Sequence, residues 1–215
     1  MLRVATGALL LSASIAVAAC ASDPADEKTA AATKLIALTR ETRTTYSMVV
    51  WNRIQRPGAA IVEEWSAEFH DGIRHRVETP RDRMVADCVA MTGTYVEIPT
   101  GKIITGARVA RAAWGINANM PILAARIGGK HQNRFGGVVR VAVVDSDNVR
   151  TYDVAENGAL LAATISDRKG NRLLTNWAVS YSPDVPADIF SEASLARSVV
   201  PDELKRAPMP GLHSR

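Results

Sequence analysis

The 215-residue chain is 47% hydrophobic, and its 26 lysines and arginines outnumber its 22 aspartates and glutamates, for a formal net charge of +4 at pH 7. This apolar content excludes a disordered chain and is enough for one core, and the length favours a single folded domain. The signal for export at the start of the chain excludes nucleic acid as a partner, because an exported protein meets none. We interpret the positive charge as solvated surface charge in preference to attraction to anionic lipid head groups or envelope polymers.

Residues 1–19 have the three parts of an export signal. Arg3 supplies a positive charge, residues 4–17 are apolar, and the small residues Ala18 and Ala19 precede a possible cleavage point. The segment is short and rich in alanine, serine and glycine, whereas a spanning helix needs about 20 strongly apolar residues. We therefore expect residues 1–19 to be removed as a signal peptide.

Cys20 directly follows this segment. The residues Val17-Ala18-Ala19-Cys20 resemble the lipobox of bacterial lipoproteins, in which the cysteine sulfur carries a diacylglycerol and its new amine a fatty acyl group such as palmitate. The resemblance implies lipid attachment at Cys20; the alternative is an ordinary signal peptide with Cys20 there by chance. Because Ala21 and not aspartate follows, it also implies the periplasmic face of the outer membrane rather than inner-membrane retention. Residues 20–30 then form the lipidated cysteine and a flexible tether.

The remaining chain predicts a helix followed by antiparallel strands. The helix covers residues 30–43, and alternation and turn residues place strands at 44–54, 59–69, 73–79, 84–90, 94–98 and 102–105. Two short helices are predicted at 106–116 and 119–127, the second ending at Gly128-Gly129. Strands resume at 138–144, 148–154, 159–166 and 172–181, and a loose tail is expected over 200–215.

The hairpin around Asp71 tests the strand register. A two-residue loop at Asp71-Gly72 would pair Ala67 with Arg76 and put basic residues on the apolar side. A three-residue loop, 71–73, pairs Ala67 with Val77 and Glu68 with Arg76, so that apolar meets apolar and opposite charges meet. We therefore predict the longer loop.

Two segments resemble the lipoprotein-sorting proteins of the LolA/LolB/RseB group. They are "GIRHRVETPRDRMVADCVAMTGTYVEIPTGKI" at 72–103 and "NWAVSYSPDVPADIF" at 176–190. The resemblance implies an α+β domain over residues 31–199, with a strongly curved antiparallel sheet, or half-barrel, and short helices covering its concave face. It also implies binding of a lipid or of the acyl chain of a lipoprotein.

The chemistry-bearing residues do not form a recognisable catalytic motif. Glycine-rich phosphate loops, nucleophile elbows and metal-binding pairs are absent from the sequence. The predicted register puts His70 and His75 on opposite faces of the sheet, and Cys88 has the apolar setting of a small buried residue. We therefore expect no catalysis, no metal and no cofactor.

The aromatic and valine positions of the strands are the candidate ligand site. Their setting predicts either an apolar cavity or a packed core, and the candidate residues are Trp51, Trp65, Phe69, Trp114, Val139, Val141, Val143 and Trp177. The sequence thus predicts a membrane-anchored envelope lipoprotein that binds an apolar ligand. The alternative is a regulatory or scaffold lipoprotein that contacts other envelope proteins, and an exported hydrolase is third.

Overall fold

A single antiparallel sheet of eleven strands forms the molecule. The computed structural model describes residues 29–32, 34, 44–113 and 123–206. The strand order is β6-β5-β4-β3-β2-β1-β11-β10-β9-β8-β7, two meanders joined where β1 pairs with β11. The strands are β1 (Thr45–Ile54), β2 (Val62–Asp71), β3 (Arg74–Glu78), β4 (Asp82–Asp87), β5 (Thr92–Glu97), β6 (Lys102–Thr105), β7 (Ala124–Asn133), β8 (Gly136–Val144), β9 (Asn148–Ala155), β10 (Leu160–Asp167) and β11 (Arg172–Ser182).

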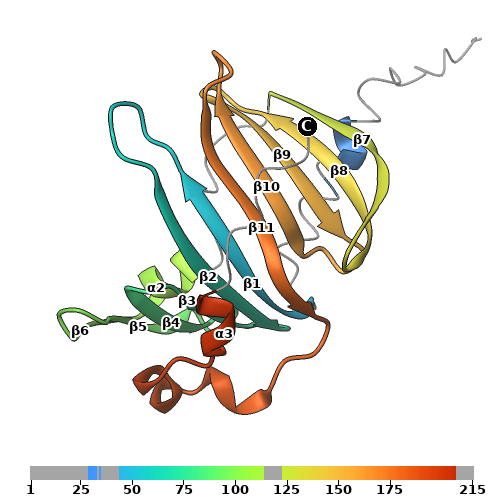
Figure 1. Cartoon of the computed structure of the whole chain (residues 1–215). Helices are drawn as coiled ribbons and strands as arrows, with labels where there is room; N and C mark the ends of the chain where they lie inside the picture. The colour runs from blue at the N-terminus through green and yellow to red at the C-terminus, as the bar shows by residue number, and fades with distance from the viewer. Residues whose placement is uncertain (1–28, 33, 35–43, 114–122, 207–215) are drawn as a thin grey trace, which may run out of the picture.

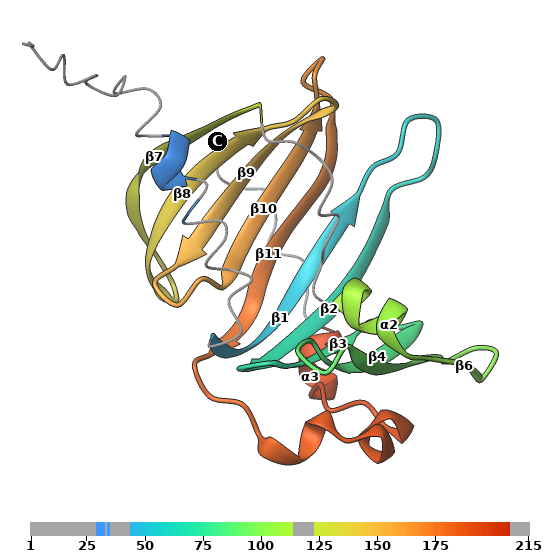
Figure 2. The same ribbon diagram turned by 180° about the vertical axis from the view of Figure 1, so that it is seen from behind.

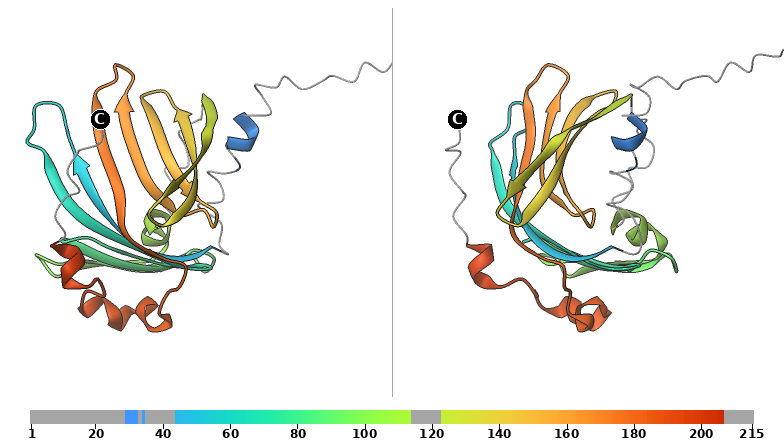
Figure 3. Two further views of the ribbon diagram at one scale, coloured as in Figure 1. Left: turned by 45° about the vertical axis from the view of Figure 1, so that its right-hand side comes forward. Right: turned by 90° about the vertical axis from the view of Figure 1, so that its right-hand side faces the viewer.

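The sheet is strongly curved, and β6 and β7 stand at its two edges (Figure 1). The helix α2 (Ala107–Ala113) lies on the concave side, as the view from behind in Figure 2 shows. The short helices η1 (Ala187–Phe190), η2 (Glu192–Ala196) and α3 (Asp202–Lys205) lie on the convex side (Figure 3). The predicted α+β half-barrel is thus confirmed, with the short helix α2 on its concave face and η1, η2 and α3 on its convex face.

Strand alternation assigns these helices to opposite faces. Ala86 of β4 packs against α2, whereas Arg83 of the same strand donates from Nη1 to the carbonyl of Leu195 in η2 at 2.9 Å. Residues an odd number apart on a strand point to opposite faces. The α2 side and the η2 side of β4 are therefore the two faces of the sheet.

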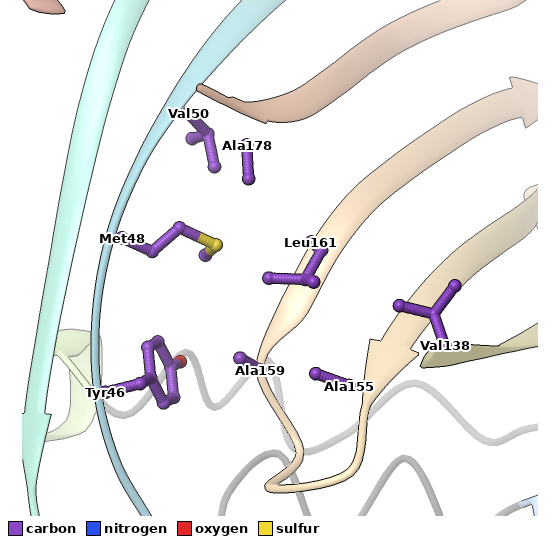
Figure 4. Packing of buried hydrophobic residues seen from close by; sticks show 8 residues of the cluster. All are labelled: Tyr46, Met48, Val50, Val138, Ala155, Ala159, Leu161 and Ala178. Atoms are coloured by element: carbon purple, nitrogen blue, oxygen red, sulfur yellow. The ribbon is translucent and has the colours of Figure 1, made fainter. Parts of the chain in front are cut away.

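The middle of the concave side is a packed core. Side chains of β1 and β11 meet those around the turn between β9 and β10, and all are at most 7% exposed (Figure 4). The cluster consists of Tyr46, Met48, Val50, Val138, Ala155, Ala159, Leu161 and Ala178. A second cluster, toward β7, joins Ala32 to Ala125, Val141, Val143 and Val154.

A buried ion pair attaches the C-terminal segment to the convex side. Arg76 and Glu78 of β3 have side chains that are 0% exposed, and Arg76 Nη2 lies 2.6 Å from Glu78 Oε1. Arg76 also donates to the carbonyls of Ile189 at 2.8 Å and Arg197 at 3.1 Å, and to the hydroxyl of Ser194. The guanidinium thus satisfies backbone carbonyls of the segment that covers it.

Glu78 completes this attachment from the other side of the pair. Its Oε2 accepts a hydrogen bond from the hydroxyl of Ser198 at 2.7 Å, and its Oε1 accepts one from the backbone N–H of Val199 at 3.0 Å. A buried charge is tolerated only when it is paired and hydrogen-bonded. We call residues 183–206, which these bonds attach to the sheet, the C-terminal strap.

The predicted β2–β3 register is wrong by one residue. Ala67 lies opposite Glu78, and the ladder continues to Asp71 opposite Arg74, so the loop is Gly72-Ile73. Gly72 has φ +60°, the positive value that a type II′ turn needs at its first central position. This register puts Arg76 and Glu78 on the apolar side, which is possible because they pair with each other under the strap.

The predicted helix over 119–127 is also wrong in its described part, residues 123–127, while residues 119–122 lie outside the described residues. Residues 124–133 form the edge strand β7, paired with β8 along its whole length, and Gly128-Gly129 lies at a bulge in this pairing rather than at a helix end. The first predicted helix of this region is confirmed as α2. Residues 29–32 and 34 are helical, and the rest of the helix predicted at 30–43 falls outside the described residues.

The buried pair predicts a large stability loss for Arg76→Met. The substitution removes the closest counter-charge of the buried Glu78 carboxylate and leaves only Arg83, whose Nε lies 3.9 Å from Glu78 Oε2. Removing one partner of a buried pair typically costs about 3–5 kcal/mol of the free energy of unfolding. Arg53→Met is the matched control, because Arg53 and Glu63 form a partly exposed pair at 3.4 Å, whose loss should cost less than about 1 kcal/mol. Urea denaturation measures both, and equal losses would contradict the structural role of Arg76.

Candidate functional site

A pocket of about 280 Å³ opens between α2 and the strands β4, β5 and β6 on the concave side. Four aliphatic side chains and the ring of Tyr95 form most of its wall, and three charged side chains complete it. The lining residues are Met84, Tyr95, Glu97, Lys102, Ile104, Arg108, Val109 and Ala112. The volume is near the lower end of the roughly 300–1,000 Å³ common for small-molecule sites.

The strand register assembles the floor of this pocket. Met84 lies opposite Tyr95, and Tyr95 lies opposite Ile104, so the three side chains form one row across β4, β5 and β6. Directly opposite residues of antiparallel strands share a face. The next row on that face places Glu97 opposite Lys102 at the edge of the pocket.

Gly93 lets α2 approach the sheet closely enough to form the opposite wall. A Cβ at this position would lie 2.9 Å from the backbone oxygen of Val85 and 3.0 Å from a methyl group of Val109. Val109 is 4% exposed and lies between the helix and the sheet. Any side chain larger than hydrogen at position 93 would therefore displace the helix from the strands.

The rim of the pocket carries two exposed cations. Arg108 comes from α2 and Lys102 from β6, and among the described residues neither side chain forms an ion pair. Glu97 accepts a hydrogen bond from the hydroxyl of Thr100 at 2.5 Å. Burial, together with the charges of Asp82 and Glu97, raises the pKa of Tyr95.

A second polar group lies on the concave side, where Tyr46, His70 and His75 form one row across β1, β2 and β3. The rings of Tyr46 and His70 stack at 4.4 Å, and those of His70 and His75 meet edge to face at 4.0 Å. Tyr46 donates to Glu68 Oε2 at 3.3 Å. The prediction that His70 and His75 point to opposite faces is therefore wrong, because it depended on the incorrect register.

Burial controls the ionisation of this row. It lowers the pKa of His75 to about 4, helped by the neighbouring His70, and it raises the pKa of Tyr46, helped by Glu68. Burial also raises the pKa of Glu68, but hydrogen bonds from His70 and Tyr46 outweigh it and the net shift is downward. Neither ring nitrogen of His75 has a hydrogen-bond partner within the part of the chain that the structure describes.

The candidate aromatic residues do not line this pocket. Trp65 and Phe69 are buried under the C-terminal strap, with Trp51 packed against the same cluster. Trp51 lies opposite both Trp65 and Trp177, so the three tryptophans share the convex face. Leu204 of α3 packs in this cluster, and Lys205 Nζ lies 5.8 Å from the centroid of the Trp65 ring. The first residues of the segment that we predicted to be a loose tail, 200–215, are therefore packed against the sheet.

The candidate valines belong to a different part of the sheet. Val141 and Val143 are buried beside Ala32, with Val139 partly buried against them. The structure therefore separates the valines from the tryptophans. Trp114 and Cys20 fall outside the described residues.

The remaining candidates for chemistry show no reactive arrangement. Cys88 is 2% exposed, and burial, with a contribution from Asp87, raises the pKa of its thiol to about 11. The described residues contain no group of three or more His, Cys, Asp or Glu side chains placed to hold a metal ion. Their helices also include none that is long and apolar enough to cross a membrane.

Solved structures identify the fold. An uncharacterized conserved protein from Thermus thermophilus aligns with a TM-score of 0.53 at 13% identity, over 78% of this chain and 94% of that one. MucB, in the Pseudomonas aeruginosa MucA/MucB complex, aligns with a TM-score of 0.51 at 14% identity, over 74% of this chain and 59% of its own. The chain thus spans about three fifths of MucB. No family model and no curated protein matches the sequence.

These likenesses establish a class of fold rather than an individual activity. The chain shares its curved-sheet fold with MucB, in agreement with the predicted resemblance to the LolA/LolB/RseB group.

Sequence reasoning missed the pocket residues. In the sequence, Arg108 and Lys102 carry no motif that marks a site, and Tyr95 lies within the strand predicted at 94–98. The available signal was the glycine at position 93 opposite the small residue Ala86, because this pairing marks a place where a helix can approach a sheet.

His75 predicts acid sensitivity of the fold. Its pKa is lower in the folded chain than the ordinary 6.5, so between pH 6.5 and about 4 the unfolded chain binds more protons. Stability should fall as pH falls through this window, by up to about 3 kcal/mol from this residue. His75→Phe should flatten this part of the stability profile, measured by urea denaturation.

His131→Gln is the matched control for this prediction. His131 is about one third exposed and lies 3.2 Å from Asp153, far along the chain from the buried row. Its replacement should leave the slope between pH 6.5 and 4 as it is in the unmodified chain. An unchanged slope for His75→Phe would contradict the account of a histidine buried without its proton.

Proposed function

We propose that this chain is an exported, non-catalytic lipoprotein, anchored at Cys20 to the periplasmic face of the outer membrane, which binds an apolar ligand on the concave side of its sheet. The ligand is a lipid or the acyl chain of a lipoprotein. The observation that carries this proposal is the mostly apolar pocket between α2 and β4–β6. Each methylene group removed from water there contributes about 0.8 kcal/mol.

The two faces of the sheet support a binding role for the concave side. On the convex side the strap covers Trp65, Ala67 and Phe69 and is attached by the buried Arg76–Glu78 pair. Among the described residues, the centre of the concave side is packed and a pocket lies at the α2 end, which supports entry of a chain there. We infer a ligand bound at one end of the half-barrel and not along its whole length.

A regulatory or scaffold lipoprotein that contacts another envelope protein is the second candidate. The observation favouring it is the likeness to MucB, which was solved in complex with MucA. In this candidate the partner occupies part of the sheet surface and a lipid is not required. The two candidates differ in whether blocking the pocket removes the binding function.

The anchor is tested by Cys20→Ser. Because several acyl chains on one residue make a lasting membrane anchor, the variant should lose membrane association and stay in the soluble fraction after export. Labelling with an alkyne fatty acid, followed by membrane fractionation, measures both effects. Equal labelling of the variant and the unmodified chain would contradict attachment at Cys20.

The pocket is tested by Ala112→Trp. Ala112 is exposed and lines the pocket, so a larger side chain should fill the site without entering the core. For the chain from residue 21 onward, which keeps every described residue, we expect 1-monolaurin to bind with about micromolar affinity and the variant to bind about tenfold more weakly. Isothermal titration calorimetry measures this.

Arg111→Trp is the matched control, since Arg111 is an exposed residue of the same helix that does not line the pocket. It should bind monolaurin as the unmodified chain does. Equal weakening in both variants, or the absence of binding to any single-chain amphiphile in the unmodified chain, would favour the scaffold candidate.

A further inference from the structure

The pocket under α2 combines an apolar floor with a cationic rim from two elements. Met84, Tyr95 and Ile104 form the floor, and Arg108 and Lys102 stand at the edge on opposite walls, one on the helix and one on β6. Both side chains are exposed to solvent. An amphiphile that enters chain first would leave its head group between them.

The charges around the rim favour an anion. Arg108 and Lys102 supply two positive charges, and Glu97 supplies the one negative charge among the lining residues. Within the described ranges, no acidic side chain forms an ion pair with either cation, whereas Arg76, Arg140 and Arg150 each lie within 3 Å of a carboxylate oxygen. A guanidinium without a protein partner is free to bind a carboxylate or phosphate through two parallel hydrogen bonds.

The size of the pocket limits the number of chains. Its volume of about 280 Å³ is close to the smallest volumes found for small-molecule binding sites. Such a space suits one acyl chain and not the several chains of a lipoprotein anchor. The ligand that fits is therefore smaller than the lipid that we place on Cys20.

We propose that the pocket is selective for a single-chain anionic amphiphile, with the chain between α2 and the Met84–Tyr95–Ile104 row and the head group bound by Arg108 and Lys102. This inference rests on the proposed lipid-binding function and adds the class of ligand. Fatty acids and single-chain lipid phosphates share the required chemistry. The position of Glu97 beside Lys102 makes Arg108 the stronger of the two head-group contacts.

The test compares ligands that share a twelve-carbon chain. Dodecanoate, dodecyl phosphate, neutral 1-monolaurin and cationic dodecyltrimethylammonium are titrated into the chain from residue 21 onward, below the concentrations at which they form micelles. We expect the two anions to bind about tenfold more tightly than monolaurin, because one added hydrogen bond to a charged group is typically worth about that much or more. The cation should bind most weakly.

Arg108→Ala should remove this preference. It should weaken binding of dodecanoate and dodecyl phosphate about tenfold and leave monolaurin within about twofold. Arg108→Lys keeps the charge and should recover part of the loss, while Arg111→Ala, on the same helix and outside the pocket, should change none of the affinities. High salt should reduce the preference for anions in the unmodified chain.

The possible results separate this inference from the function on which it rests. Binding of monolaurin and dodecanoate with equal affinity, unaffected by Arg108→Ala, would overturn the anionic selectivity and leave lipid binding in place. Binding of none of the four ligands would overturn both. A preference for one anion over the other would support the inference and would identify the head group as a carboxylate or a phosphate.

Discussion

The buried pair of Arg76 and Glu78 is the constraint on which the arrangement of this molecule depends. Two charges with no exposed surface have to satisfy all their hydrogen-bonding groups within the protein, and here the C-terminal strap supplies the partners. Since those partners are backbone groups and serine hydroxyls of residues 189–199, the pair holds the strap on the convex face. The strap in turn buries Trp65 and Phe69, which would otherwise be exposed.

This division gives the two faces different roles. The convex face is closed by chain that is far away in sequence, while the concave face is packed at its centre and open at the α2 end. The half-barrel is therefore neither hollow throughout nor filled throughout. At the α2 end, the missing side chain of Gly93 lets α2 come close to the strands and form one wall of the pocket.

The sequence predicted the strands well and their pairing less well. Nearly every strand lies where alternation and turn residues put it, but the β2–β3 register was off by one residue. The choice of register assumed that Arg76 would lie on the polar face, because a charged residue is rarely buried. In the structure Arg76 is buried, and the carbonyl of Ile189, 113 residues away in the sequence, accepts one of its hydrogen bonds. Rules for pairing neighbouring strands do not include a partner that is so distant in the sequence.

By itself, the sequence determined the order of most of the strands and the resemblance that gives the class of fold. These follow from residue types and from their spacing along the chain, which need no contact between distant segments. Only the tertiary structure decided which face each tryptophan occupies, that His70 and His75 meet, and that Arg108 and Lys102 stand over one pocket. The physical reason is that side chains alternate with a period of two, so a shift of one residue in the pairing moves every side chain of a strand to the other face.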